Sequence, residues 1–132
     1  MRVVLSKPYL ICWLAIPALV LIRLLFPQHT VDIQLYDTYF VIASLSFVLA
    51  GSVLLLLLGA GYWLVKLKGK MPNGMLTIIH LLLTVGVLLL VVLPVFNTNT
   101  LESGKWVVFS VIALFVGQLT YIVNILAALV RK

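Results

Sequence analysis

The chain has 132 residues, of which 64% are hydrophobic and only 9% are charged, and its mean hydropathy is +1.29. A soluble domain carries roughly 25% charged residues, so this chain has too little charge to cover a soluble surface. The net charge is +6, but the basic residues lie at the ends of apolar runs and form no stripe. That placement excludes a nucleic-acid-binding surface and is typical of membrane insertion.

Four apolar runs are long enough to cross a bilayer, which takes about 20 residues of helix. In chain order, we expect membrane spans at residues 8–26, 39–65, 75–94 and 106–130. What remains is too short for a soluble domain. The sequence therefore predicts a single membrane domain over residues 1–132, folded as an all-α, integral membrane four-helix bundle. Because the loops are short, sequential helices should be antiparallel neighbours.

The charged residues predict how the four spans are oriented. With four spans, seven basic residues fall on one side of the membrane: Arg2, Lys7, Lys66, Lys68, Lys70, Arg131 and Lys132. The acidic residues Asp32, Asp37 and Glu102 fall on the other side. Because positive charge in short loops marks the cytoplasmic side, we expect a multi-pass protein with both termini in the cytoplasm, in a bacterial cytoplasmic membrane.

The last span carries a stripe of small and polar residues at alternating spacings of three and four. Its members are Ser110, Ala113, Gly117, Thr120 and Asn124. Small residues let helix backbones approach closely in a membrane, and polar residues form hydrogen bonds between helices. The stripe therefore predicts a helix interface, either inside the bundle or between protomers.

The third span has Thr77, His80 and Thr84 on one helix face. An ionisable residue inside a membrane is a functional candidate, so His80 is a candidate cofactor-binding residue. The alternative is a neutral histidine that forms a hydrogen bond with a threonine or a backbone carbonyl.

The segment from Asp32 to Pro94 resembles a known family. It includes the motifs Asp32-Ile33, Asp37-Thr38-Tyr39-Phe40-Val41, Tyr62-Trp63, Gly69-Lys70-Met71-Pro72-Asn73 and Leu76-Thr77-Ile78-Ile79-His80. These motifs are similar to the tenth and eleventh helices of subunit I of cytochrome c oxidase, in the heme-copper oxygen reductase family. The whole chain would then correspond to the C-terminal four-helix part of that subunit. The resemblance implies that residues 32–49 enter the membrane as a helix from the outer side.

Departures from the family pattern fall on its metal ligands. Ser44 and Ser46 stand where the family has its heme-ligating histidines, and Tyr36 replaces a magnesium-ligating histidine. A serine hydroxyl does not hold heme iron as imidazole does. The resemblance therefore implies a protein without the oxidase chemistry, and we expect neither an enzyme nor a bound cofactor.

Three functions remain open from the sequence. The first is a non-catalytic structural or assembly subunit of a membrane complex, such as a respiratory complex, or a homo-oligomer. The second is a heme- or quinone-binding electron-transfer protein, with a site formed by His80 side chains of neighbouring protomers. The third is a proton or small-molecule conduit, lined by Ser44, Ser46, Thr77, Thr84, Thr120 and Asn124.

The outer loop contains a candidate metal site formed by His29, Asp32 and Asp37, because one imidazole and two carboxylates can bind a divalent ion. The alternative is that Asp37 caps the second helix, where a carboxylate suits the helix dipole. As partners we expect membrane lipid and either further copies of this chain, with a trimer as the specific expectation, or other membrane subunits.

Overall fold

The computed structural model describes residues 6–27, 30–35, 37–93 and 101–130. These residues form α2 (Pro8–Leu25), β1 (Thr30–Leu35), β2 (Thr38–Ala43), α3 (Ser44–Leu67), α4 (Gly74–Val92) and α5 (Leu101–Val130). All four helices are long and apolar enough to cross a membrane. The expectation of four membrane-spanning helices is therefore confirmed at the level of length and composition.

A β-hairpin interrupts the helical architecture and corrects the all-α expectation. β1 and β2 pair antiparallel, with Thr30 opposite Ala43 and Leu35 opposite Thr38. The second expected span began at residue 39, whereas the helix begins at Ser44. The physical reason lies in β2 itself, which reads Thr-Tyr-Phe-Val-Ile-Ala and is rich in β-branched and aromatic residues that favour strands.

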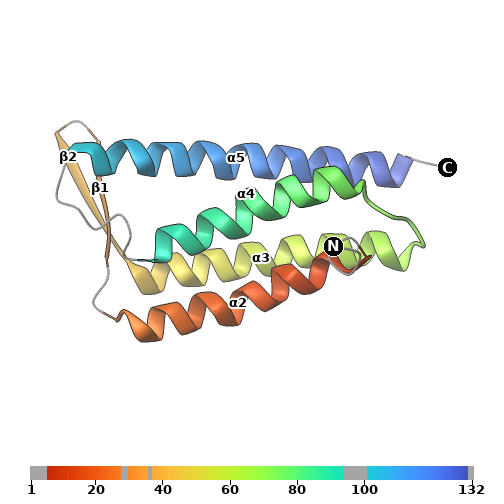
Figure 1. Cartoon of the computed structure of the whole chain (residues 1–132), viewed down its shortest axis with the longest axis horizontal. Coiled ribbons are helices and arrows are strands. Elements are labelled where there is room, and N and C mark those ends of the chain that lie inside the picture. Colours follow the sequence, from red (N-terminus) through yellow and green to blue (C-terminus); the bar gives the residue numbers. More distant parts are fainter. Residues whose placement is uncertain (1–5, 28–29, 36, 94–100, 131–132) are drawn as a thin grey trace.

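The hairpin also corrects the alternative role given to Asp37. This residue lies between the two strands, and the N-cap position of α3 is Ala43. The Asp37 carboxylate therefore does not cap the second membrane helix. The family resemblance implied a helix through this segment, and here the structure places the same residues in a hairpin at one end of the bundle (Figure 1).

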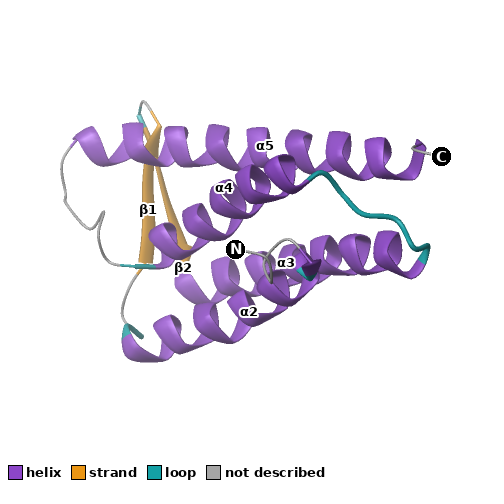
Figure 2. Ribbon diagram, turned by 45° about the vertical axis from the view of Figure 1, so that its right-hand side comes forward, coloured by secondary structure: helices purple, strands orange, loops and turns teal. Residues whose placement is uncertain are grey.

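The turn between α3 and α4 forms the opposite end of the bundle (Figure 2). Gly69 adopts a φ of 69°, a left-handed conformation that glycine adopts without strain. Asn73 then caps α4, because its side-chain oxygen accepts a hydrogen bond from the Met75 backbone N–H at 3.0 Å. Local chemistry thus ends one helix and starts the next within a few residues.

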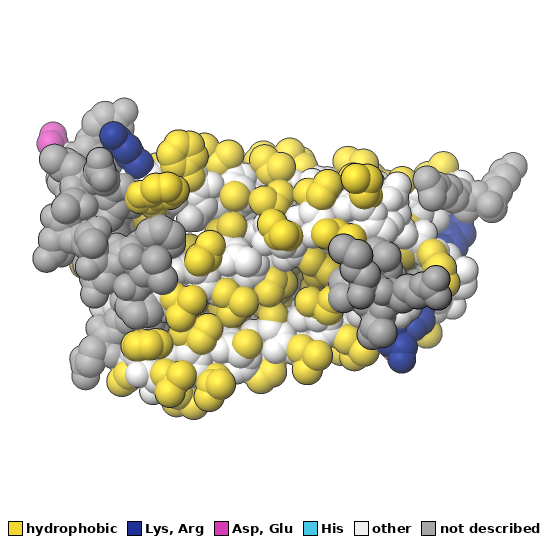
Figure 3. Space-filling view, in the orientation of Figure 1, with side chains coloured by type: hydrophobic (Ala, Val, Ile, Leu, Met, Phe, Trp, Pro, Cys, Tyr) yellow, Lys and Arg dark blue, Asp and Glu magenta, His cyan; other side chains and the backbone are white. Residues whose placement is uncertain are grey.

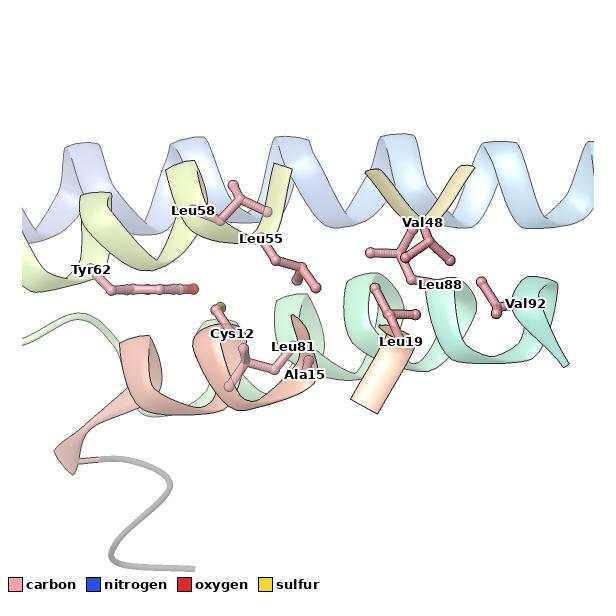
Figure 4. Packing of buried hydrophobic residues seen from close by; sticks show 10 residues of the cluster. All are labelled: Cys12, Ala15, Leu19, Val48, Leu55, Leu58, Tyr62, Leu81, Leu88 and Val92. Carbon is pink, nitrogen blue, oxygen red and sulfur yellow. The ribbon is translucent and has the colours of Figure 1, made fainter. Parts of the chain in front are cut away.

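The helices pack mainly as two pairs, α2 with α3 and α4 with α5, and α2 also contacts α4. Buried side chains from α2, α3 and α4 point toward one another in the apolar core (Figure 4). At its centre lie Leu19, Leu55 and Leu88, which are at most 3% exposed. The apolar core therefore joins the two helix pairs into one bundle.

The outer surface of the helices is an apolar belt. Figure 3 shows hydrophobic side chains along the length of the helices, with lysine and arginine side chains gathered toward the two ends. A soluble protein rarely exposes a continuous apolar surface of this extent, whereas lipid tails cover such a surface. The belt agrees with a protein that lies across a membrane.

Candidate functional site in the bundle interior

Polar side chains on α4 face the inside of the bundle. Thr77, His80 and Thr84 follow one another at spacings of three and four, and all three are buried. Because residues three and four apart share a helix face, one strip of α4 is both polar and hidden from lipid. This strip is the face that the sequence singled out.

His80 forms a buried hydrogen bond with a tyrosine of α3. Its ring Nδ1 lies 2.9 Å from the Tyr62 hydroxyl oxygen, and neither residue is more than 1% exposed. The partner is thus a phenol rather than the threonine or carbonyl considered from the sequence. A polar pair inside hydrocarbon stabilises the contact between α3 and α4, because neither group has water as an alternative partner.

Tyr121 of α5 completes an aromatic cluster around this pair. Its ring centroid lies 4.9 Å from that of His80 and 5.1 Å from that of Tyr62, the latter in an edge-to-face arrangement. The Tyr121 hydroxyl donates a hydrogen bond to the Leu58 carbonyl at 3.2 Å. It lies against Gly61, where any added Cβ would collide with it. Three helices therefore meet at one imidazole and two phenol rings.

The second ring nitrogen of His80, Nε2, is buried and has no hydrogen-bond partner in the described part of the chain. A buried N–H donor without a partner costs about 1–3 kcal/mol. With the proton on Nδ1, the ring donates to Tyr62 and Nε2 is a buried acceptor; with the proton on Nε2, the Tyr62 hydroxyl donates to Nδ1. Chemically, an unprotonated Nε2 could ligate a metal or accept a proton if a reactant could reach it.

Access to His80 is closed on the outside of the bundle. The side chain has 0% exposed area, and rings from α3 and α5 pack against it. A heme held between two protomers needs imidazole at the outer surface, so the helices of this bundle would first have to separate. The geometry therefore gives a heme site between protomers no support.

Asn124 of α5 is the second polar centre of the interior. Its side-chain oxygen accepts a hydrogen bond from the Asn73 backbone N–H at 2.8 Å. Its amide nitrogen donates to Thr77 Oγ1 at 2.9 Å and to the Asn73 carbonyl at 3.3 Å. The Thr77 hydroxyl in turn donates to that same carbonyl at 2.8 Å. Both ends of the Asn124 amide are thus used to hold α5 against the start of α4.

The rest of the predicted stripe divides between two environments. Gly117 is buried against α4, where a Cβ would lie 3.0 Å from Thr84 Oγ1. The neighbouring Gln118 donates a hydrogen bond to Thr84 at 3.2 Å.

Two other members of the stripe form hydrogen bonds within their own helix. Ser110 donates to the Trp106 carbonyl, and Thr120 donates to the Val116 carbonyl. Ala113 is half-buried. Near Gly117 and Asn124, the stripe lies inside the bundle.

The two serines that the family resemblance singled out, Ser44 and Ser46, have different surroundings. Ser44 is buried at the first turn of α3, and Ser46 is exposed on the outside of the same helix. Residues two apart on a helix lie about 200° apart around its axis, so they cannot both face one interior site. The residues proposed to line a conduit are likewise split between the interior and the outer surface.

The structure describes two of the three residues of the candidate metal site. His29 lies outside the described residues, and Asp32 lies on β1, opposite Val41 in the hairpin register. Asp37 is exposed between the strands. Within the described ranges there is no group of three or more histidine, cysteine or acidic residues placed to hold a metal ion.

Sequence reasoning missed Tyr62 and Asn73 as members of the interior network. Tyr121 flanks the predicted stripe on α5, three residues before Asn124, so the sequence does indicate it. Tyr62 had no comparable signal, since its partner His80 is 18 residues away on another helix. Asn73 participates mainly through its backbone, which spacing patterns do not reveal.

Comparisons with protein-family models, with curated proteins and with solved structures find no match to this chain.

Proposed function

We propose that this chain is a non-catalytic structural or assembly subunit of a membrane complex. Its resemblance to the C-terminal four-helix part of cytochrome c oxidase subunit I supports a respiratory complex as the setting. Serine at positions 44 and 46 supports the absence of heme from α3, because a hydroxyl is a poor ligand for heme iron.

The observation that carries the proposal is the closed polar interior. The Asn124 amide bonds to Asn73 and Thr77, Gln118 bonds to Thr84, and the imidazole of His80 is covered by aromatic rings. A catalytic or conducting site needs polar groups that are open to a substrate or to water. In this bundle the polar groups hold helices together, as in a scaffold.

The partner-binding surface in this proposal is the outer face of α5. Only 6% of an apolar 18-residue stretch of α5 is buried within the chain, against 39% of the corresponding stretch of α3. Exposed apolar side chains lie along this face of α5, including Phe115, Leu119 and Leu126. Because the polar part of the stripe faces α4, the interface would be apolar. The partner is another membrane subunit or, in a trimer, further copies of the chain.

The test is the mass and absorption spectrum of the gently solubilised protein. We expect a particle heavier than the 14.6 kDa chain, without a bis-histidine heme band that maps to α3. A matched pair of variants locates the interface: Phe115→Ala on the outer face of α5 should shift the mass toward the single chain, whereas Leu56→Ala on the outer face of α3 should not. A lone chain in mild detergent would contradict the proposal, as would heme bound through α3.

We also propose the orientation of the bundle, with antiparallel neighbouring helices and both termini in the cytoplasm of a bacterial cell. The lysines of the α3–α4 turn support this orientation, since basic short loops stay on the cytoplasmic side.

Cysteine labelling of intact cells tests the orientation. In a Cys12→Ser background, a membrane-impermeant maleimide should label Asp37→Cys from outside and should label Lys68→Cys only after the cells are opened. Both positions are exposed, so differences in burial do not explain a difference in labelling. Labelling of Lys68→Cys in intact cells would reverse the proposed topology.

A further inference from the structure

A pocket with two lysines in its lining lies where α2 begins and α3 turns into α4. Its volume is about 190 Å³, and its lining includes Pro8, Tyr62, Lys66, Lys70 and Pro72. In a bundle that lies across a membrane, this end is where the helices leave the hydrocarbon, as the basic turn indicates. The pocket is therefore at the level of lipid headgroups.

The two lysines are held in place at the pocket. The Lys66 ammonium lies over the Tyr9 ring, 5.2 Å from its centroid. The Lys70 ammonium donates a hydrogen bond to the Leu129 carbonyl near the end of α5. An ammonium group has three N–H donors, so that bond leaves donors for a ligand. α2 also begins at the pocket with Pro8, and the positive end of its dipole adds to the attraction for an anion.

A second, apolar groove lies further along the same pair of helices. Its volume is about 320 Å³, and it is lined by Ile11 of α2 and by α4 residues from Ile78 to Leu89, including Gly86. Ile11 is one helical turn beyond Pro8, so the groove follows the pocket along α2 toward the middle of the membrane. Along α4 the lining covers about 16 Å at 1.5 Å per residue. This is close to half of a hydrocarbon core about 30 Å thick, which is the depth of one leaflet.

We propose that the pocket and the groove together bind one anionic phospholipid. The phosphate lies between Lys66 and Lys70, and one acyl chain lies in the groove between α2 and α4. Charge complementarity selects the headgroup, because basic pockets between membrane helices attract anionic lipids. The length and apolar lining of the groove select an acyl chain rather than a free phosphate ion.

Native mass spectrometry of the full chain tests this site with two probe lipids, phosphatidylglycerol and phosphatidylcholine. We expect one retained phosphatidylglycerol per chain and weaker retention of phosphatidylcholine. Lys66→Gln should lower phosphatidylglycerol retention about fivefold, from the loss of one lysine near the headgroup. Lys68→Gln is the matched control, because Lys68 is exposed in the same turn and does not line the pocket.

A second variant tests the acyl-chain part without removing charge. A Cβ at Gly86 has no atom within 4 Å, so Gly86→Leu can extend into the groove without a backbone clash. We expect it to lower retention about threefold through lost apolar contact. The control is Ala50→Leu, which adds the same side chain at an exposed position of α3.

Three results would overturn the proposal. The first is an equal loss of phosphatidylglycerol retention in Lys66→Gln and Lys68→Gln, which would indicate that the lipid is attracted to the charged turn in general. The second is unchanged retention in Gly86→Leu. The third is displacement of the lipid by millimolar inorganic phosphate, which would show that the pocket binds an anion without its acyl chain. Circular dichroism of each variant verifies that the helices remain folded.

Discussion

Gly117→Leu should destabilise the bundle by about 3 kcal/mol, because it adds bulk where two helices touch. A Cβ at this position would lie 3.0 Å from Thr84 Oγ1 and 3.3 Å from the Leu83 Cβ. The remaining atoms of a leucine have no room, so α4 and α5 must separate. That separation also weakens the hydrogen bond from Gln118 to Thr84.

This decrease in the free energy of unfolding is measured by unfolding the purified protein in mixed micelles and monitoring the helices by circular dichroism. Gly117→Ala should fall between the wild type and Gly117→Leu. The matched control is Gly86→Ala, because a Cβ at Gly86 meets nothing within 4 Å. The control should keep or raise stability, since alanine favours helix over glycine by about 1 kcal/mol. Equal effects of alanine at the two glycines would contradict the close contact of α4 and α5.

Asn124→Leu should lower the free energy of unfolding by about 2 kcal/mol, through lost hydrogen bonds and polar groups left unpaired. The change removes the acceptor for the Asn73 backbone N–H and the donor to Thr77 Oγ1. The site is completely buried, so water cannot replace either contact. Membrane hydrogen bonds contribute about 0.6 kcal/mol each on average, which keeps the expected loss moderate.

Thr120→Ala is the control for this prediction, because it removes a polar group from the same stripe. The Thr120 hydroxyl donates to the Val116 carbonyl within its own helix, and no contact between helices is lost. We expect a change below about 0.5 kcal/mol, as for most substitutions away from buried contacts. If Thr120→Ala lowered the free energy of unfolding as much as Asn124→Leu, the hydrogen bonds of Asn124 between α4 and α5 would not be the source of stability.

The sequence was sufficient to predict four helices able to cross a membrane, because length and apolar composition alone set that requirement. It did not predict the hairpin. The run from Tyr39 to Ala43 is apolar enough to extend a membrane helix, and it is also β-branched and aromatic enough to form a strand. Hydropathy does not distinguish these outcomes, and the family resemblance favoured the helix.

For the interior site, the sequence predicted which residues share a face of one helix, but it did not predict which residues of different helices would meet. Spacing showed that Gly117 and Asn124 share a face of α5, and that Thr77 and His80 share a face of α4. Which residues would meet depends on the register and rotation of one helix against the other, and a single sequence does not contain this information. The contact between His80 and Tyr62 depends on such an arrangement of two helices.

The hairpin limits how deeply this protein can sit in a bilayer. Within the described residues the sheet has two strands, so the outer edge of each strand carries backbone groups that no further described strand pairs. Such groups cannot remain in hydrocarbon, so the hairpin must stay in the interfacial layer, where its exposed Tyr39 and Phe40 are well accommodated. At 1.5 Å per residue, the 18 residues of α2 span about 27 Å and the 24 residues of α3 about 36 Å. The length of α2 therefore limits the thickness of hydrocarbon that the bundle can cross. The extra length of α3 is accommodated by tilting or by projecting beyond the hydrocarbon.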